Sequence, residues 1–506
     1  MNGTNNNTQQ MSNNIKTLGE LKNSGWKSIS VKEEIRKNLI DKMGSPEALF
    51  PGILGYDNTV IPQIQHALLG KHDLLLLGLR GQAKTRILRL LVNFLDEELP
   101  IVAGSEINDD PYNPVSKFAR ELIDEHGDET PIEWIGRDLR YGEKLATPDT
   151  TVADLIGDLD PIKAASKRLT LADEEVINFG LIPRVNRGIF VINELPDLQP
   201  RIQVALLNIM QERDIQIRGF NIRIPLDLFM AFSANPEDYT NRGNIITPLK
   251  DRIDAQIITH YPKSLSIAKE IANQEAWLDR DNKRIVHIPD IFRQILAQVA
   301  FEARESEYID QKSGVSARLT ITALEQVVSA AERRMVINGE KSTSLRIADL
   351  YHMVPALTGK LELVYEGEQE GAVNVAKHLL GKAINKTFKA VLPDPQRKTR
   401  EEEKINPYKN VLDWFAAGNT LDLPDQLTEK EYKKRLDQVD GLREIVENMN
   451  DHQQNESYPI RDFVIEALHQ NSMLGKEDLD EVRSYSDMLG SMLGGMGDFD
   501  PDDYPD

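Results

Sequence analysis

An α/β fold is predicted for the first half of this 506-residue chain, and a mainly helical structure for the second half. Two observations predict this. From about residue 51 to residue 262, short apolar runs suited to buried strands alternate with stretches of helical pattern. Residues 263–392 have an almost wholly helical pattern, as in IPDIFRQILAQVAFEARE and TITALEQVVSAAERRMVI. The chain is too long for one hydrophobic core, so two to four domains are expected.

Composition excludes several classes of protein. The formal net charge of −21 and the pI near 5.0 argue against a general affinity for nucleic acid or for an anionic membrane. No apolar run reaches the length of a membrane span, and the N-terminus MNGTNNNTQQMSNN has no signal-peptide pattern, so a cytoplasmic protein is expected. The absence of cysteine removes disulfides, thiolate zinc sites and cysteine nucleophiles.

The stretch LLLLGLRGQAKTRILRLL, from residue 74 to residue 91, is close to a phosphate-binding P-loop. Gly78, Lys84 and Thr85 have the spacing of G-x-x-x-x-G-K-[ST], but Ala83 replaces the second glycine. An apolar strand precedes the loop and a helical pattern follows it, as the motif requires. Loop amides would then hold phosphates, Lys84 would reach the β and γ phosphates, and Thr85 would bind Mg²⁺. The methyl group of Ala83 forbids only backbone angles that need glycine, and Gly81 remains a flexible point. A strand, a glycine turn and a helix with no ligand is the alternative.

Two further apolar strands end in polar residues. RGIFVINELPDL presents Asn193 and Glu194, where an ATPase needs one carboxylate for the water shell of Mg²⁺ and another to activate the attacking water. Glu194 fits the second role, whereas Asn193 keeps an acceptor oxygen without the charge. LDLFMAFSANPED presents Asn235, which could hydrogen-bond the γ-phosphate or the water. Asn-Pro is also a common turn, so Asn235 alone is weak evidence.

Two arginines are candidates for neutralising charge on the transferred phosphoryl group. Arg252 lies in TPLKDRIDAQI before the next strand, and Arg318 lies in GVSARLTITALEQ near the start of a helix. Surface arginines in salt bridges are commoner than catalytic ones, so it is the combination with the other motifs that matters.

The order of these motifs resembles that of AAA+ ATPases. More narrowly, the chain resembles the ATPase subunit of magnesium chelatase and its MoxR relatives. The segments that carry the resemblance are TTVADLIGDLDPIKA, FGLIPRVNRGIFVINELPDL, the hairpin-like ERDIQIRGFNIRIPLDLFMAFSANPED, and GVSARLTITALEQVVSAAERR, which is similar to the sensor-2 helix. It covers roughly residues 46–340 and implies an αβα nucleotide-binding domain with a helical lid.

The resemblance also implies a role for each candidate residue, with ATP and Mg²⁺ as cofactors. Walker A would comprise Gly78, Gly81, Gln82, Ala83, Lys84 and Thr85, and the metal would be held by Thr85 and Asn193. Glu194 would be the catalytic carboxylate of Walker B, and Asn193 departs from the family's Asp. Asn235 would be sensor 1, Arg252 the finger acting on a neighbour's nucleotide, and Arg318 sensor 2. Arg242 is a second candidate for a contact between subunits.

Four segments are expected. They are a disordered N-terminus with a helical lead-in (1–45), the AAA+ αβα domain (46–262), the helical lid with sensor 2 (263–392), and a charged helical extension ending in an acidic Met/Gly tail (393–506). Residues 104–180 are expected to hold an insertion. In the resembled family an insertion here transmits force to a partner, and a solvated decoration is the alternative.

The leading hypothesis is a ring-forming AAA+ motor that couples ATP hydrolysis to remodelling or metal loading of a partner protein. The resemblance implies a homo-oligomer, a hexameric ring, and a separate partner with a von Willebrand factor A-type domain, because the chain contains no D-x-S-x-S motif. A scaffold that binds ATP but barely hydrolyses it is the alternative, which Ala83 and Asn193 support. A transcriptional activator or helicase lacks support, since no helix-turn-helix is recognisable and the charge is acidic.

Overall fold

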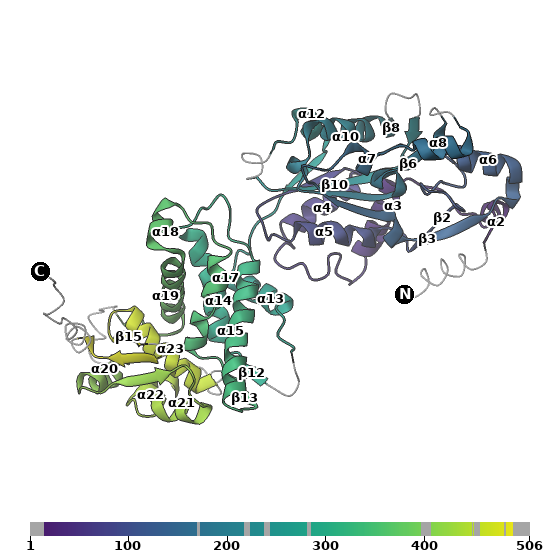
Figure 1. The fold of residues 1–506 in the computed structure, drawn as a ribbon. Coiled ribbons are helices and arrows are strands. Elements are labelled where there is room, and N and C mark those ends of the chain that lie inside the picture. Colours follow the sequence, from purple (N-terminus) through teal and green to yellow (C-terminus); the bar gives the residue numbers. More distant parts are fainter. Residues whose placement is uncertain are drawn as a thin grey trace, which may run out of the picture. The chain divides into compact units, whose positions relative to one another are not determined.

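The computed structural model describes residues 15–169, 173–216, 223–236, 243–280, 285–395, 406–447, 449, 456–479 and 482–488. These residues form two compact units, divided between His260 and Tyr261, which are drawn in Figure 1 and described here separately. The first unit contains the central sheet, and the second contains the long helices α14 (Asp290–Glu305), α15 (Arg318–Ile337) and α19 (Ala372–Val391). The four segments predicted from the sequence, with their boundaries, stay predictions.

The first unit is built on a five-stranded parallel sheet. Its strands, numbered one to five along the chain, lie in the spatial order 5-1-4-3-2. In that spatial order they are β11 (Ala255–Ile258), β1 (Leu74–Leu77), β10 (Leu228–Ala234), β7 (Gly188–Asn193) and β4 (Tyr141–Leu145). Because the strands are parallel, the residues that follow β1, β7 and β10 all lie at one edge of the sheet, where ligands bind in open α/β folds.

Helices cover both faces of this sheet, as a buried parallel sheet requires. Alternate side chains of β1, β7 and β10 pack with helices α3 (Val31–Met43), α4 (Val60–Leu69) and α5 (Lys84–Leu90) on one face. The remaining side chains pack with α10 (Pro200–Glu212) and α12 (Thr247–Arg252) on the other. The apolar runs in the sequence therefore specify strands covered on both faces, and the predicted α/β fold is confirmed.

Smaller elements decorate the first unit. Among the described residues of this unit, three antiparallel pairs form: β2 (Glu98–Val102) with β3 (Ile132–Gly136), β5 (Gly157–Leu159) with β6 (Ile177–Phe179), and β8 (Asp214–Gln216) with β9 (Arg223–Pro225). The other α-helices are α2 (Leu18–Asn23), α6 (Lys117–His126), α7 (Val152–Leu155), α8 (Pro161–Lys167) and α9 (Leu181–Arg184).

The stretch predicted to be an insertion, residues 104–180, contributes to the central sheet as well as to the decoration. Strand β4 lies inside this stretch and pairs with β7 as the edge strand, with Tyr141 beside Ile189 and Leu145 beside Asn193. Its side chains are mostly half-exposed, because one side of β4 has no neighbouring strand among the described residues of the sheet. The sequence YGEKL therefore lacks the apolar run that identifies the central strands.

The second unit has one continuous apolar core that runs from the helices predicted as a lid into the C-terminal extension. The helices before residue 392 are α13 (Leu265–Glu275), α14 (Asp290–Glu305), α15 (Arg318–Ile337), α16 (Ile347–Tyr351), α17 (Val354–Thr358), α18 (Tyr365–Glu370) and α19 (Ala372–Val391). Two short strands, β12 (Ile285–His287) and β13 (Ser342–Ser344), pair in parallel.

The C-terminal extension contains a sheet besides its helices, which the sequence pattern did not predict. Strands β14 (Leu421–Pro424), β16 (Val482–Ser486) and β15 (Gly475–Leu479) form an antiparallel sheet in that order. The helices are α20 (Lys409–Ala416), α21 (Glu429–Leu436), α22 (Leu442–Glu447) and α23 (Ser457–Gln470). Asp487 and Met488 are the last described residues, so nearly all of the acidic Met/Gly tail lies outside the described residues.

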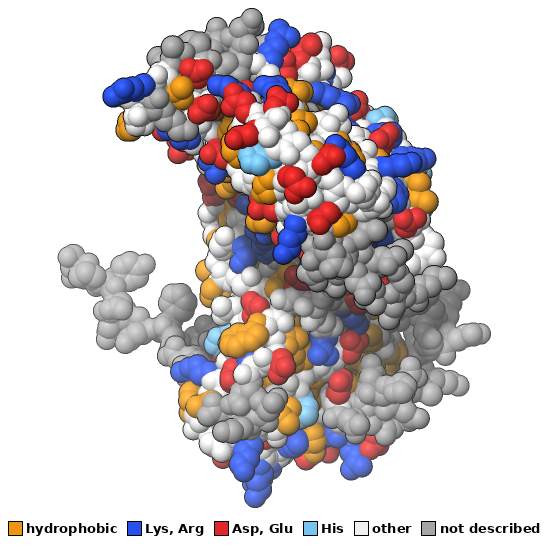
Figure 2. Space-filling model, turned by 90° about the vertical axis from the view of Figure 1, so that its right-hand side faces the viewer, with side chains coloured by type: hydrophobic (Ala, Val, Ile, Leu, Met, Phe, Trp, Pro, Cys, Tyr) orange, Lys and Arg blue, Asp and Glu red, His pale blue; other side chains and the backbone are white. Residues whose placement is uncertain are grey.

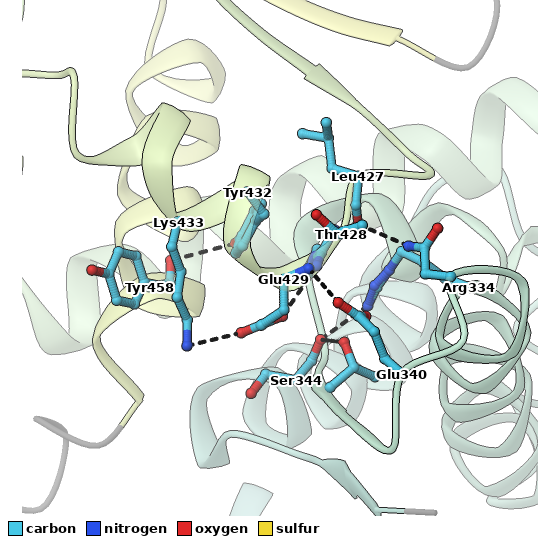
Figure 3. Close-up of polar contacts among 12 residues, drawn as sticks. Arg334, Glu340, Ser344, Leu427, Thr428, Glu429, Tyr432, Lys433 and Tyr458 are labelled. Carbon is cyan, nitrogen blue, oxygen red and sulfur yellow. Dashed lines mark hydrogen bonds and ion pairs between the residues drawn. The ribbon is translucent and has the colours of Figure 1, made fainter.

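Hydrogen bonds tie the extension to the segment that follows α15 (Figure 3). The carboxylate of Glu340 accepts a bond of 2.8 Å from the backbone amide of Glu429, at the first residue of α21. The buried guanidinium of Arg346 donates to the Leu427 carbonyl at 2.7 Å and to the Glu429 carboxylate at 3.1 Å. It also lies 4.1 Å from the ring centroid of Tyr432. These contacts and the shared core hold the extension firmly to the helices before it.

The surface is mixed in charge. On the face drawn in Figure 2, Lys and Arg side chains are interspersed with Asp and Glu side chains over the described residues. Within the described ranges, none of the helices has the length and apolar composition needed to cross a membrane.

Candidate functional site

The loop between β1 and α5 is held in place by contacts to neighbouring parts of the first unit. The side-chain oxygen of Gln82 accepts a hydrogen bond of 2.6 Å from the Thr259 hydroxyl, just after β11. The Gln82 carbonyl accepts another from the Tyr56 hydroxyl at 3.1 Å. A methyl group on Gly78 would collide with the side-chain oxygens of Gln82 and Thr259, so glycine is required there. These contacts hold the loop against the segments that carry Tyr56 and Thr259.

Two loop residues have left-handed backbone angles. Gly81 has φ +72°, which glycine adopts without steric cost. Ala83, the residue before α5, has φ 57° and ψ 14°. Alanine in this region costs roughly 1 kcal/mol because its Cβ approaches the following carbonyl. Ala83, which replaces the motif's second glycine, therefore has backbone angles that favour glycine.

Replacing Ala83 with glycine is expected to raise the free energy of unfolding of the first unit by up to about 1 kcal/mol, since the strain disappears. Urea unfolding checks this. Ala317→Gly is the matched control, because Ala317 also precedes a helix without a side-chain cap but has φ −59°. A gain of the same size in both variants would contradict strain at Ala83.

Lys84, the first residue of α5, folds back over the loop. Its side chain is buried, and its ammonium group donates to the Gly78 carbonyl and, at 3.0 Å, to the Leu79 carbonyl. The loop thus holds a cation next to its own backbone, at the N-terminus of a helix. A helix N-terminus and a neighbouring ammonium group both attract anions.

Hydroxyl and amide groups from three chain segments meet beside the loop. The Thr85 hydroxyl lies 3.4 Å from Oδ1 of Asn193, at the end of β7, and the Ser233 hydroxyl donates to the same oxygen at 2.9 Å. Ser233 belongs to β10 and also accepts a bond of 3.2 Å from the backbone amide of Glu194. The structure therefore brings together Thr85, Asn193 and Glu194, which were predicted as site residues from the sequence. It adds Ser233 to them.

Glu143 on β4 extends this cluster and was missed by sequence reasoning. Its carboxylate accepts a bond of 2.9 Å from Nδ2 of Asn193. Arg89 on α5 donates to both oxygens of the same carboxylate, at 2.8 and 2.9 Å, and Tyr141 donates at 3.1 Å. The hydrogen bond from Arg89 is the main cause that lowers the pKa of Glu143, and partial burial opposes it. No motif marks this carboxylate in the sequence.

The oxygens of this cluster fit a hard divalent cation. A carboxylate can only accept hydrogen bonds, so the atom of Asn193 that faces Glu143 must be its NH₂ group. Its oxygen is thereby directed toward the Thr85 hydroxyl. Hydroxyl and amide oxygens are ligands that Mg²⁺ takes together with water and phosphate oxygens. Thr85 and Asn193 are therefore suited to the metal role predicted for them.

The hydrogen bonds described above do not include the other candidate residues. Asn235 directly follows β10 and is half-exposed at the carboxyl edge of the sheet. Arg252 ends α12 and donates to Gln211 at 2.9 Å and to the Pro248 carbonyl at 3.1 Å. Arg318 begins α15 in the second unit, with an exposed side chain. Arg242 lies outside the described residues. The roles assigned to these residues stay predictions.

Comparison with known proteins finds sequence similarity to the magnesium-chelatase 38 kDa subunit. Over 264 residues the chain is 26% identical to the magnesium-chelatase 38 kDa subunit of Rhodobacter capsulatus, which covers 51% of this chain and 68% of that protein. Over 130 residues it is 27% identical to the subunit of the same name from Cereibacter sphaeroides, covering 25% of this chain and 36% of that protein. The second match thus spans little more than a third of that relative. No protein-family model matches the chain.

Two solved structures are distant matches. A structure of the complex between subunits BchI and BchD of magnesium chelatase is 20% identical, with a TM-score of 0.33, covering 64% of this chain and 99% of that chain. NtrX from Brucella abortus is 12% identical, with a TM-score of 0.34, covering 57% of this chain and 54% of that chain. The sequence matches confirm the predicted resemblance to the magnesium chelatase subunit, and the five-stranded parallel sheet confirms the predicted α/β fold.

Proposed function

We propose that this chain, whose sequence resembles that of the magnesium-chelatase 38 kDa subunit, binds ATP at residues 78–85 and hydrolyses it with Mg²⁺. The observation that carries the proposal is the hydrogen-bonded cluster at the carboxyl edge of the sheet. Thr85, Asn193 and Ser233 come from three different segments and are joined by bonds of 3.4 and 2.9 Å. This convergence, beside a fixed loop that carries a buried lysine, supports a nucleotide site more than a plain glycine turn.

The residues of the site would divide the work. Lys84 would exchange the carbonyls of Gly78 and Leu79 for the β and γ phosphates. Thr85 and Asn193 would hold Mg²⁺, which when bound neutralises charge on the phosphates. Glu194 would orient and activate the attacking water.

Assembly into a homo-oligomeric ring follows in this proposal from the role of Arg252, and six subunits is the number that the resemblance implies. Its side chain is partly exposed at the C-terminal end of α12, where it could reach the nucleotide of an adjacent subunit. Arg318 would contact nucleotide as sensor 2, and Asn235 as sensor 1. The motor would act in the cytoplasm on a separate protein with a von Willebrand factor A-type domain, by remodelling it or loading it with metal, as in the magnesium chelatase and MoxR group.

A weakly hydrolysing, nucleotide-gated scaffold is the second candidate. The left-handed backbone of Ala83 favours it, because strain in the loop could slow the chemical step without preventing binding. Asn193 favours it too, since an amide oxygen holds a metal less firmly than a carboxylate.

The proposed function is tested by measuring ATP binding and phosphate release on the full chain. The wild type is expected to bind ATP and to release phosphate only with Mg²⁺. Lys84→Ala should weaken ATP binding by about tenfold or more, because a charge-assisted contact is lost. Lys22→Ala is the control, since Lys22 forms an exposed pair with Asp128 at 2.6 Å.

Three results separate the possibilities. Binding with phosphate release that Lys84→Ala abolishes supports the ATPase. Binding without release, even with a partner present, supports the scaffold and contradicts the motor. A wild type that binds no ATP contradicts both.

A further inference from the structure

Glu143 is placed where it can act on the metal site. It lies in β4 opposite Val191, on the same face of the sheet as Asn193, which is two residues further along β7. Helix α5, which carries Arg89, packs on this face through Ile87 and Leu88. The carboxylate is therefore held between the edge of the sheet and the helix that begins at Lys84.

A charged acceptor at this position changes the amide that it contacts. The Glu143 carboxylate accepts from Nδ2 of Asn193 at 2.9 Å, while Oδ1 of the same amide faces the hydroxyls of Thr85 and Ser233. Donation to an anion pushes electron density through the amide toward its oxygen, because hydrogen bonds in a chain polarise one another. Oδ1 thereby becomes a stronger ligand than the oxygen of an isolated amide.

We propose that Glu143 supplies, through the amide of Asn193, the negative charge that the Walker B position of this chain lacks. Glu143 is a positioning residue in this proposal: it fixes the orientation of the Asn193 amide and strengthens its oxygen toward Mg²⁺. The inference rests on the proposed function, because it concerns the same nucleotide site.

The ion pair of Glu143 with Arg89 could instead serve stability alone. The Arg89 side chain is 64% exposed and that of Glu143 is 21% exposed. Exposed ion pairs contribute little to folding. The contact to Asn193 goes beyond this exposed ion pair, because it satisfies the NH₂ group of a buried amide and fixes which of its atoms faces Thr85. The geometry therefore favours a role in the site.

In this proposal, the site needs one carboxylate, which can stand at position 143 or at position 193. Asn193→Asp alone would place a second carboxylate about 3 Å from Glu143 and remove the donor between them, so the metal-free protein should lose stability. Adding Glu143→Gln should restore both the hydrogen bond and the charge balance, with the carboxylate now at position 193. If the two residues acted independently, Glu143→Gln would not reverse the effect of Asn193→Asp in a double-mutant cycle.

The experiment measures ATP affinity by calorimetry in EDTA and in Mg²⁺, together with thermal unfolding of the metal-free protein. The variants are Glu143→Gln, Asn193→Asp and the double variant Asn193→Asp/Glu143→Gln. In the wild type, Mg²⁺ should raise the ATP affinity above its value in EDTA. Glu143→Gln should make this gain about tenfold smaller, as removal of a partner of a metal ligand does. The double variant should recover that gain to within about threefold of the wild type.

Glu174→Gln is the matched control. Glu174 also pairs with an arginine, Arg120, at 3.5 Å, and the exposed fractions of the two side chains, 14% and 54%, are close to those of Glu143 and Arg89. This control should leave the Mg²⁺ gain unchanged.

The outcomes separate this inference from the proposed function. A wild type without any Mg²⁺ gain in ATP affinity overturns both. A wild-type gain that Glu143→Gln preserves overturns the inference alone. A double variant that remains as weak in Mg²⁺ as Glu143→Gln also overturns it, since the charge then cannot be moved to position 193.

Discussion

Replacing Glu194 with glutamine is expected to lower the rate of ATP hydrolysis by about a hundredfold or more, with ATP affinity nearly unchanged. Glu194 follows the last residue of β7, and its backbone is fixed in the left-handed region, with φ 55°, by a bond of 3.2 Å from its amide to Ser233. Glutamine keeps the size of the side chain but cannot accept a proton from water. The loss should therefore appear in the turnover rate and spare binding.

Phosphate release and ATP binding, measured on the same preparations, check this result. Glu212→Gln is the control, because Glu212 is an exposed carboxylate at the end of α10. If Glu194→Gln hydrolyses ATP as fast as the wild type, another group activates the water. In that case the assignment of Glu194 is wrong although the nucleotide site stands.

Replacing Arg252 with alanine should lower turnover by about a thousandfold if its guanidinium completes the site of a neighbour, as arginine fingers do. Its bonds to Gln211 and to the Pro248 carbonyl hold it at the end of α12. Loss of these two bonds should change the stability of the subunit little, since the group is about one-third exposed.

Mixing two inactive variants distinguishes a contact between subunits from one within a subunit. A subunit with Glu194→Gln retains Arg252 and can supply it to an adjacent Arg252→Ala subunit, whose own Glu194 is intact. The mixture should then regain part of the activity that neither variant shows alone. Arg201→Ala, an exposed arginine on α10, is the control and should be active by itself. A mixture without activity would contradict action on a neighbour.

The strands that build the site could be predicted because they are buried on both faces. The runs LLLL, GIFVIN and LFMAFSA form β1, β7 and β10, and the polar residues after them meet at one edge of the sheet. The meeting of Thr85 with Asn193 follows from this topology, which a parallel α/β pattern already implies.

The remaining features depend on contacts that periodicity does not encode. Strand β4 is a half-exposed edge strand, so its pattern gives no apolar run, and Glu143 gained a role only when register placed it beside β7. The left-handed angle of Ala83 depends on the path of the loop. In the extension, β15 and β16 form a hairpin of largely polar residues, for example GKEDL, whose pattern does not mark a strand.

The continuous core of the second unit has a mechanical consequence. Packed protein interiors transmit strain, so a displacement of helix α15 would be passed to strands β14 and β16, whose buried residues share its core. Arg318 is at one end of α15, while Glu340 and Arg346, beyond its other end, grip the start of α21. A small rotation of α15 at Arg318 would therefore displace the extension, and the displacement would grow along the helix away from Arg318.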